Sequence, residues 1–423
     1  GANRSIYEAI VLLKDTVKSY LKFQLRKKNE TEILLLGTNR FFDIPDQGAV
    51  EGYTWAIWNK FKSLTLYCTL YQKDKRNEPF DEMYSLDFIK NKAKILSKIQ
   101  VKNGKKYRDY YDLIYDDIYT FFKKYNAETD EYIINKTINE IVLLYYEYKT
   151  ASKAFKKILC DFGIKMIVEV CYYDRFHIYL NHVAKNLGIN VIELQHGLMG
   201  SKHLAYNFEP IETHLTGFPD NVLLFSQYWK DTTRLPLSEH NAIVVGFPMF
   251  DAMIRKNLRE GKNCDKVNNI LFISQWTVSS QMYDFAVKLS KNEKLNKYNI
   301  IYKLHPFEKK ENFTNFPKIK IIGNEQSVYD LFPLARVQVG AYSTALYEGL
   351  GFGLPTFIIS SLDEEENMKA LHDEGFCDYV DTPEELVEKM ENSAQSLPND
   401  FWEKNAEKNM IDEIERLLWM QKE

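Results

Sequence analysis

The chain has 423 residues, of which 45% are hydrophobic, and its 55 basic and 59 acidic side chains give a formal net charge of −4. This size and composition favour a globular protein of two domains, and the near-neutral charge argues against a dedicated nucleic-acid binder. The five cysteines stand singly, which predicts neither a zinc site nor a disulfide framework and fits a reducing cytoplasm.

The first predicted element is an amphipathic helix over residues 7–28 with a basic end. Such a helix suits the surface of an anionic membrane, and it equally suits packing on a domain with its basic end in solvent. No apolar run reaches the roughly 18 to 20 residues that a spanning helix needs, and no signal-peptide pattern opens the sequence. We therefore expect a cytoplasmic protein, with peripheral contact to the inner face of the membrane as one interpretation of this helix.

A Rossmann-like domain is expected over residues 1–254. It begins with the apolar strand 33–37 and a turn-rich loop that contains Asp46, and further strands are predicted at 165–171, 190–194, 221–226 and 242–246. A helix is predicted over 175–187. Residues from about 86 to 163 have a helical, tyrosine-rich pattern, which predicts a helical insertion whose aromatic stripe packs helices together.

A second Rossmann-like domain is expected over residues 255–400, after a polar, strandless hinge between residues 246 and 267. It opens with the strand 269–274, and residues 299–359 have the periodicity of strand, loop, strand, helix and strand. Further helices are predicted at 280–289, 383–390 and 401–423, the second of them from a capping box with proline at its first position.

One helix start in the second domain is suited to an anion. The hydroxyls of Ser343 and Thr344 open a helix that follows a strand, and the unpaired N–H groups of a first helical turn bind phosphate with help from the helix dipole. His305 is predicted at the carboxyl end of a neighbouring strand, where open parallel sheets bind ligands. The pattern predicts a phosphate or pyrophosphate site, with a helix cap that holds no ligand as the alternative.

These residues form a motif that resembles a known group of enzymes. The donor half of GT-B glycosyltransferases, which have two Rossmann-like domains facing across a cleft, is similar in its His-Pro pair and in the spacing of Gly340, Ser343, Thr344, Glu348, Gly353 and Pro355. The resemblance is to bacterial capsule and lipopolysaccharide transferases, among them sialyltransferases with a His-Pro motif and teichoic-acid glycerophosphotransferases. It covers residues 166–386 well and the preceding residues poorly.

The resemblance implies which residues bind the donor. They are His305, Pro306, Gly340, Ser343, Thr344 and Glu348. The histidine and the two hydroxyls would hold the nucleotide phosphate, and Glu348 would bind the ribose diol, although a carboxylate at this place in a helix is also consistent with an exposed side chain. Enzymes of this kind generally need no metal, so we expect neither a metal nor another cofactor.

The loop Gln195-His196-Gly197 follows a predicted strand of the first domain and resembles the His-Gly loop that faces the cleft in capsule and teichoic-acid transferases. Inverting transfer needs a base for the acceptor hydroxyl, and an imidazole suits that task. His196 is therefore the leading candidate, and its neighbours Gln195 and Gly197 are expected to contact the acceptor or the donor. Sialyltransferases instead use a carboxylate in an acidic motif, of which this sequence has only Asp46, so the base stays open among His196, Asp46 and Asp174.

Three further residues are secondary candidates for contact with an anionic donor or acceptor, although such side chains are usually just solvated. They are Arg175, His203 and Lys303. The acidic run 363–366 is placed where a helix is expected to start, so the helix dipole accounts for it without a metal.

We expect an inverting glycosyltransferase that moves a sugar from a nucleotide-activated donor to a glycan or glycolipid hydroxyl in surface-polysaccharide synthesis, with a CMP-linked acidic sugar favoured. Three alternatives remain open. They are a CDP-polyol phosphotransferase, an epimerase of nucleotide-linked amino sugars, whose first loop is similar to residues 37–40, and a non-catalytic scaffold for a capsule complex. No nucleic-acid partner is expected.

Overall fold

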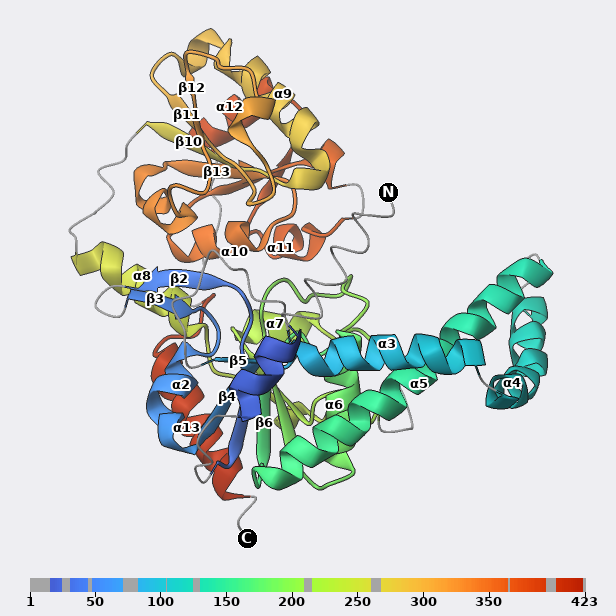
Figure 1. Ribbon diagram of the computed structural model, residues 1–423. Helices are drawn as coiled ribbons and strands as arrows, with labels where there is room; N and C mark the ends of the chain where they lie inside the picture. Colours follow the sequence, from blue (N-terminus) through green and yellow to red (C-terminus); the bar gives the residue numbers. More distant parts are fainter. Residues whose placement is uncertain are drawn as a thin grey trace.

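The computed structural model describes residues 16–24, 31–44, 48–70, 83–103, 105–124, 130–208, 215–259, 268–363, 366–392 and 401–420. Two separate parallel sheets organise these residues, one below the other in Figure 1. A short antiparallel pair, β2 (Phe41–Ile44) and β3 (Gly48–Glu51), lies between the sheets beside α8 (Pro248–Arg259).

The first sheet has the order β5-β4-β1-β6-β7-β8-β9 with every pair parallel. Its strands are β1 (Ile33–Leu36), β4 (Thr65–Thr69), β5 (Tyr84–Ser85), β6 (Met166–Val170), β7 (Asn190–Leu194), β8 (Asn221–Leu224) and β9 (Ala242–Val244). The central strands β1 and β6 are buried at every position, as their apolar runs require when helices cover both faces of a sheet. The covering helices include α2 (Trp55–Phe61), α6 (Arg175–Lys185), α7 (Gln227–Thr232) and α13 (Ala406–Trp419).

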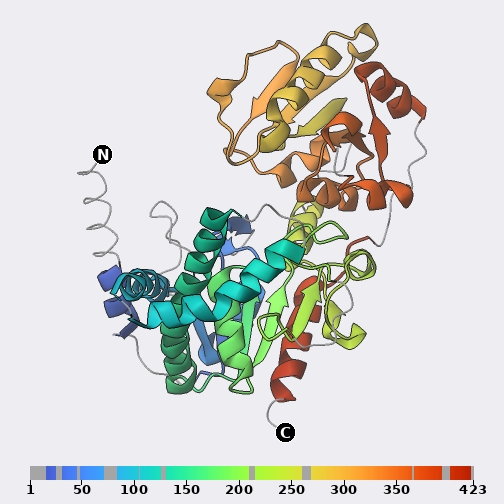
Figure 2. The same ribbon diagram turned by 90° about the vertical axis from the view of Figure 1, so that its right-hand side faces the viewer.

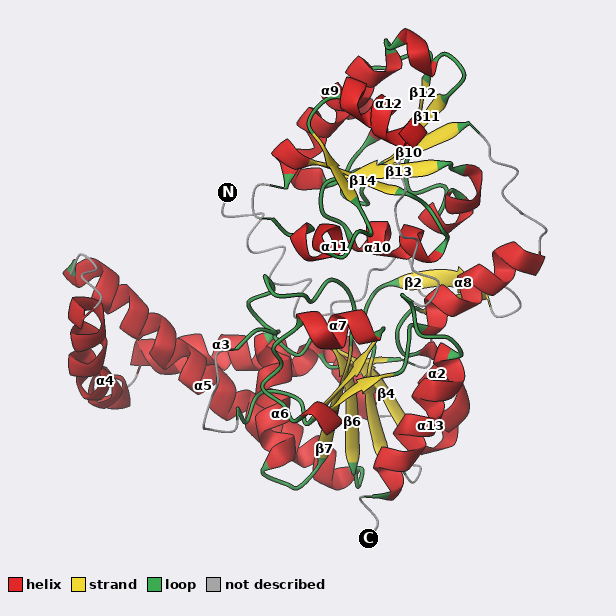
Figure 3. Cartoon of the chain, turned by 180° about the vertical axis from the view of Figure 1, so that it is seen from behind, coloured by secondary structure: helices red, strands yellow, loops and turns green. Residues whose placement is uncertain are grey.

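The second sheet has the order β12-β11-β10-β13-β14-β15, again with every pair parallel. Its strands are β10 (Asn269–Ile273), β11 (Asn299–Lys303), β12 (Ile319–Ile322), β13 (Val337–Gly340), β14 (Thr356–Ile359) and β15 (Asp378–Val380). Helices α9 (Ser279–Ser290) and α12 (Pro383–Asn392) pack together on one face. Helices α10 (Thr344–Gly351) and α11 (Lys369–Asp373) lie on the side that faces the first domain (Figures 1 and 3).

A helical insertion projects from the first domain, in the place where the tyrosine-rich pattern predicts it. It consists of α3 (Asp87–Asn103), α4 (Lys105–Lys124) and the 31-residue α5 (Glu131–Asp161). Figure 1 shows it extending away from the first domain, and in Figure 2 it lies in front of the first sheet. Apolar residues of α5 are buried against the aromatic stripe of α4, namely Ile134, Ile138, Val142 and Tyr146. The stripe therefore packs helices, as interpreted from the sequence.

Two segments that connect the domains differ from the predictions. The expected hinge over 246–267 contains α8, whose apolar side packs on α13 and β2, because apolar residues recur at helical spacing between the charged ones. The final helix begins at Ala406 rather than at residue 401. Phe401 and Trp402 precede it and are buried, and the Trp402 indole donates to the Tyr347 carbonyl at 3.0 Å. One apolar cluster therefore continues from the first domain to α10.

The predicted N-terminal helix is only partly within the described residues, of which 16–24 are helical. Phe23 is buried, whereas Val17, Tyr20 and Leu21 are exposed. Among the helices within the described ranges, none has the length and hydrophobicity to cross a membrane. Contact with a membrane surface stays a prediction.

Helix α10 lies close against its sheet because of a glycine. Gln338 of β13 is fully buried and its amide donates to the Leu346 carbonyl at 2.7 Å, and a β-carbon on Gly349 would overlap this carboxamide. We expect Gly349→Ala to destabilise the second domain by about 1–3 kcal/mol through overpacking. Thermal unfolding followed by circular dichroism measures this effect, and an unchanged melting temperature would contradict the packing described.

Candidate active site

The residues of the candidate site follow strands that are neighbours in each sheet. In the first domain Arg40, Tyr173 and His196 come after β1, β6 and β7, which lie side by side in that order. In the second domain His305 comes after β11 and Ser343 after β13, on either side of β10. The carboxyl edges of both sheets thus carry the polar groups, as open parallel sheets do at ligand sites.

The two edges meet at Gly197 and Thr344. A β-carbon added to Gly197 would lie 3.6 Å from the Thr344 hydroxyl oxygen, although the residues belong to different domains. The histidine loop of the first domain therefore faces the start of α10 directly. The structure brings together the two motifs that the sequence places about 150 residues apart.

The start of α10 has the geometry of an anion site. Ser343 is in extended conformation and its hydroxyl accepts from the Ala345 N–H at 3.4 Å, so it caps the helix, and Thr344 is the first helical residue. Both are only partly buried. The remaining first-turn N–H groups and the dipole give the helix start a partial positive charge toward the cleft. Gly340 ends β13 just before it and is packed against Leu346.

His305 is held in one tautomer by its own turn. Its Nδ1 accepts from the Phe307 N–H at 3.2 Å, so a neutral ring carries its hydrogen on Nε2. The Glu308 carboxylate accepts from the His305 N–H at 2.6 Å and from Ser274, which fixes the turn that contains Pro306. Partial burial lowers the pKa of His305 below its usual value, with Glu308 opposing this shift. The neutral ring is a suitable hydrogen-bond donor to a phosphate oxygen.

His196 is positioned by two tyrosines. Its Nε2 shares a hydrogen bond of 3.2 Å with the Tyr173 hydroxyl, and its carbonyl accepts from the Tyr53 hydroxyl at 2.8 Å. Its Nδ1 is buried, so Nε2 is the nitrogen that remains for proton transfer. Desolvation, followed by the charge of Arg40, lowers the pKa of His196 to about 3. The imidazole is therefore neutral at physiological pH and able to accept a proton.

Gln195 supports the histidine loop from below. Its side chain is 1% exposed, its oxygen accepts from the Phe225 N–H at 2.8 Å, and its amide donates to the Gly197 carbonyl at 2.9 Å. We expected this residue to contact a ligand, and the structure instead places it in the core, where it fixes the conformation of the loop.

Glu348 lies on the second turn of α10, where its carboxyl is bonded to the Tyr329 hydroxyl. Desolvation raises the pKa of Glu348 to about 8, although Tyr329 and Arg40 oppose the shift. The group is thus neutral below this pH and ionised above it. Its interactions with Arg40 and Tyr53 of the first domain place it at the contact between the two domains.

Nucleotide affinity is expected to depend on this carboxyl. As the pH rises through about 8, Glu348 ionises and a negative charge develops beside the phosphate site, so we expect CMP affinity to fall. Glu348→Gln keeps the neutral form at all pH values and is expected to abolish that decrease. Calorimetric titrations between pH 6.5 and 9 measure both proteins. An equal pH dependence in the two would contradict the assignment.

The remaining predicted candidates have local partners. Asp174 caps α6, since its carboxylate accepts from the Phe176 N–H, and Arg175 forms an ion pair of 2.8 Å with Glu147. Lys303 donates to the Gly323 carbonyl at 2.6 Å, and burial lowers its pKa. Asp46 lies outside the described residues.

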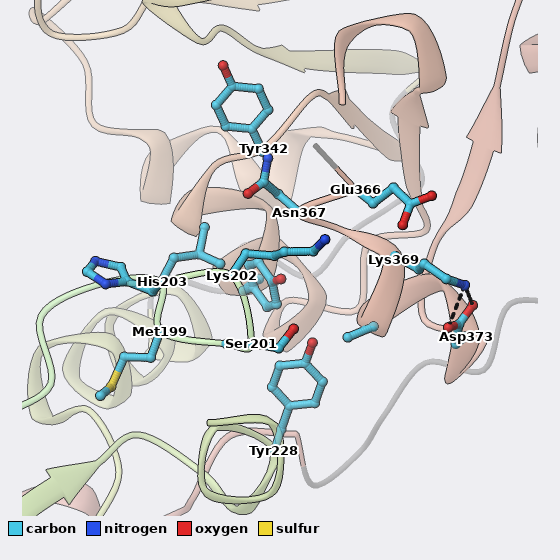
Figure 4. Close-up of a pocket in the computed structure, with 14 residues that line it drawn as sticks. Met199, Ser201, Lys202, His203, Tyr228, Tyr342, Glu366, Asn367, Lys369 and Asp373 are labelled. Atoms are coloured by element: carbon cyan, nitrogen blue, oxygen red, sulfur yellow. Dashed lines mark hydrogen bonds and ion pairs between the residues drawn. The ribbon is translucent and has the colours of Figure 1, made fainter. Parts of the chain in front are cut away.

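His203 lines a cavity next to the site. The cavity has a volume of about 500 Å³ and is enclosed by the loop 198–203 from the first domain and by residues around α11 from the second (Figure 4). Tyr342, the neighbour of Ser343, forms part of its wall, and Tyr173 contacts the rings of both His196 and His203. The cavity therefore lies beside the candidate site and has room for part of a substrate.

The acidic run has a structural role at Asp363. Its carboxylate accepts from the Asn367 and Met368 N–H groups at 2.8 and 2.9 Å and from the Tyr379 hydroxyl. Asp363 thus stabilises the backbone immediately before α11, which begins at Lys369. Within the described ranges, no cluster of histidine, cysteine or acidic side chains has the arrangement of a metal site.

Sequence reasoning did not select Arg40, Tyr53 or Tyr173 as site residues. Arg40 donates to the Tyr53 hydroxyl at 2.9 Å, and Tyr53 in turn donates to the His196 carbonyl. Their position in the sequence could have indicated Arg40 and Tyr173, because both follow the carboxyl ends of adjacent parallel strands. Tyr53 lies after the β2–β3 pair, which no periodic pattern indicates.

Solved structures with a similar fold are glycosyltransferases and related enzymes. The wall teichoic acid polymerase TagF is 14% identical with a TM-score of 0.51, covering 99% of this chain and 97% of that one. CalG4, the calicheamicin glycosyltransferase, is 11% identical with a TM-score of 0.52, covering 92% and 99%. UDP-GlcNAc 2-epimerase from Neisseria meningitidis is 11% identical with a TM-score of 0.50, covering 91% and 100%. These likenesses confirm the predicted fold of two Rossmann-like domains.

No curated protein matches the sequence. A family profile does match it, over residues 83–407, and this family is described as CDP-glycerol:poly(glycerophosphate) glycerophosphotransferase. Of the enzymes that the motif resembles, the glycerophosphotransferases are supported by this match, and the sialyltransferases are not. Because the profile covers well over half of the sequence, the chain belongs to the CDP-glycerol:poly(glycerophosphate) glycerophosphotransferase family.

Proposed function

We propose that this protein transfers a polyol phosphate from a CDP-linked polyol to a hydroxyl group of a surface polymer or its glycolipid precursor. The observation that carries the proposal is the family match, which extends over both facing motifs of the candidate site. The alternative that the sequence left open, a CDP-polyol phosphotransferase, is therefore preferred to the glycosyltransferase with a CMP-linked acidic sugar.

The transfer is a substitution at the distal phosphorus of the donor. The acceptor oxygen forms a new bond to that phosphorus while the bridging bond to CMP breaks, and CMP leaves with the bonding electron pair. The acceptor proton passes to Nε2 of His196, which is neutral because its pKa is about 3. An anionic donor beside the ring offsets the charge of Arg40 and raises this pKa during the reaction.

The second domain is suited to the leaving group. Negative charge increases on the CMP phosphate as the bridging bond breaks, and the start of α10 with its Ser343 and Thr344 hydroxyls provides donors for it. His305 adds an Nε2–H donor from the adjacent loop. These groups are held in place before the reaction by the helix cap and by the Glu308 turn, so they need little reorganisation.

The acceptor is expected to approach from the first domain, past His196. We assign the cavity of about 500 Å³ beside His203 and Tyr342 to the part of the acceptor nearest the reacting hydroxyl. Its mixed lining of tyrosine, asparagine and lysine suits a hydroxylated chain better than an apolar one.

Donor specificity tests the proposal. The purified protein is incubated with CDP-glycerol or with a CMP-linked acidic sugar, each with a polyol-phosphate primer, and ³¹P NMR follows the products. We expect CMP and a new phosphodiester from CDP-glycerol alone. Transfer from the acidic sugar without transfer from CDP-glycerol would contradict the proposal and restore the glycosyltransferase interpretation.

A further inference from the structure

A cation from the first domain, Arg40, acts on both histidines of the candidate site. Arg40 donates to the Tyr53 hydroxyl at 2.9 Å, and this hydroxyl donates to the His196 carbonyl at 2.8 Å, so the guanidinium is beside the histidine loop. Its charge also acts on His305 and Glu348, which belong to the second domain. The guanidinium charge therefore acts on groups of both domains where the two sheet edges meet.

The loop that bears Arg40 is fixed by a buried carboxylate. Glu51 is fully buried and accepts from the N–H groups of Thr38, Tyr53 and Thr54 at 2.8–3.2 Å and from two threonine hydroxyls. The Arg40 carbonyl accepts from the Gly52 N–H at 3.0 Å. Such a network makes the backbone on both sides of Arg40 rigid, which limits the entropy lost when the side chain binds a ligand.

Tyr53 orients the arginine from the other side. Its ring is 6% exposed and stacks on Phe247 with 5.6 Å between centroids, and burial raises the pKa of its hydroxyl to about 12. The hydroxyl keeps its proton at neutral pH and donates it to His196, which leaves its lone pairs to accept from Arg40. The arginine and the candidate base are thus coupled through one neutral side chain.

We propose that Arg40 binds the non-bridging oxygens of the phosphoryl group that is transferred, an inference that rests on the proposed polyol-phosphate transfer. The reacting phosphorus has to lie between the base and the leaving group, and Arg40 is a cation of the acceptor domain whose charge acts on the histidine of each side. A planar guanidinium contacts two phosphate oxygens at once and stabilises charge that spreads over them in the transition state. Arg40 is then a catalytic residue that contacts the distal phosphate, whereas α10 and His305 contact the proximal one.

This division predicts a difference between two nucleotides. CMP has only the proximal phosphate, whereas CDP also has the distal one. Isothermal titration calorimetry is expected to show that Arg40→Gln weakens CDP binding about tenfold or more and leaves CMP binding within about twofold, since a hydrogen bond to a charged group is lost only for CDP. Turnover of CDP-glycerol is expected to fall about 10²- to 10³-fold, as for other preorganised donors.

Three further variants separate this role from a structural one. Arg255→Gln removes an exposed arginine of α8 that pairs with Asp251 and is expected to change neither nucleotide's affinity. Tyr53→Phe keeps the ring on Phe247 but loses the hydroxyl, and it is expected to reduce CDP affinity less than Arg40→Gln does. Arg40→Lys is expected to recover part of the CDP affinity, because it keeps the charge and loses the paired geometry.

Equal losses of CMP and CDP affinity in Arg40→Gln would overturn the inference, as would a Tyr53→Phe protein that reproduces the whole effect. The binding measurements need no turnover. If the wild-type protein fails to use CDP-glycerol yet loses CDP affinity on Arg40→Gln, the proposed transfer is wrong and the phosphate contact stands. If it uses CDP-glycerol and Arg40→Gln is as active, the contact is wrong and the transfer stands.

Discussion

Replacing His196 by alanine is expected to lower turnover of CDP-glycerol by about 10²- to 10⁴-fold, which is the usual contribution of a general base. CMP affinity is expected to stay within about twofold, because the proximal phosphate is assigned to α10 and His305 in the other domain. Stopped assays of CMP release and calorimetry on the same preparation measure the two quantities. The reduction belongs to kcat, since the proton moves only as the acceptor attacks.

A histidine outside the site provides the control. His240 is exposed in the short 3₁₀ helix Glu239–Asn241 before β9, and His240→Ala is expected to keep full turnover. The pH dependence of kcat/KM gives a second test, because it reports the ionisation of groups in the free enzyme. Since the pKa of His196 is about 3, its ring is unprotonated throughout the neutral range, and kcat/KM is expected not to fall as the pH is lowered through 6.5. Near-normal turnover in His196→Ala would mean that His196 is not the base, and Asp46 and Asp174 would remain as candidates.

The double substitution of Ser343 and Thr344 by alanine is expected to weaken CMP binding by a few kcal/mol, given that hydrogen bonds to charged groups contribute about 1.5 to 3 kcal/mol each. The Ser343 hydroxyl also caps α10, so part of its effect is loss of order in the first turn. Calorimetric titration with CMP measures the affinity, and a melting curve shows whether the variant folds.

Loss of a helix cap needs its own control. Thr382 caps α12, where its hydroxyl accepts from the Glu385 N–H at 3.2 Å, far along the chain from the site. Thr382→Ala is expected to lower the melting temperature as a cap deletion does and to leave CMP affinity unchanged. If the folded double variant binds CMP with wild-type affinity, the phosphate does not bind at this helix start.

The sheets were predictable because their strands are strongly patterned. Runs such as Met166–Val170 and Asn269–Ile273 are nearly continuous in apolar residues, which is the signature of a strand covered on both faces, and the structure has strands there. The hinge was harder, because α8 spaces its apolar residues among charged ones and a helix of this kind resembles a linker when it is read residue by residue. The late start of α13 depends on the tertiary packing of Trp402, which no local pattern records.

The candidate site was predictable where chemistry and position coincide. His305, Ser343 and His196 are polar residues directly after buried strands, and the structure places all three at the facing sheet edges. Arg40 meets the same criterion but lies in an irregular loop, whose order comes from the buried Glu51. Gln195 was predicted wrongly for the opposite reason. It is a polar residue next to the candidate base, but its side chain points into the core and holds the loop.

The proposed transfer requires the leaving phosphate to lie at the start of α10, opposite His196. A crystal structure of the His196→Ala protein with CDP-glycerol tests it most directly, because the donor is then bound but consumed slowly. The proximal phosphate is expected to lie within hydrogen-bond distance of the Thr344 N–H and of Nε2 of His305, with the distal phosphate pointing toward Arg40. Phosphates bound away from α10, or a donor in the reverse orientation, would contradict it.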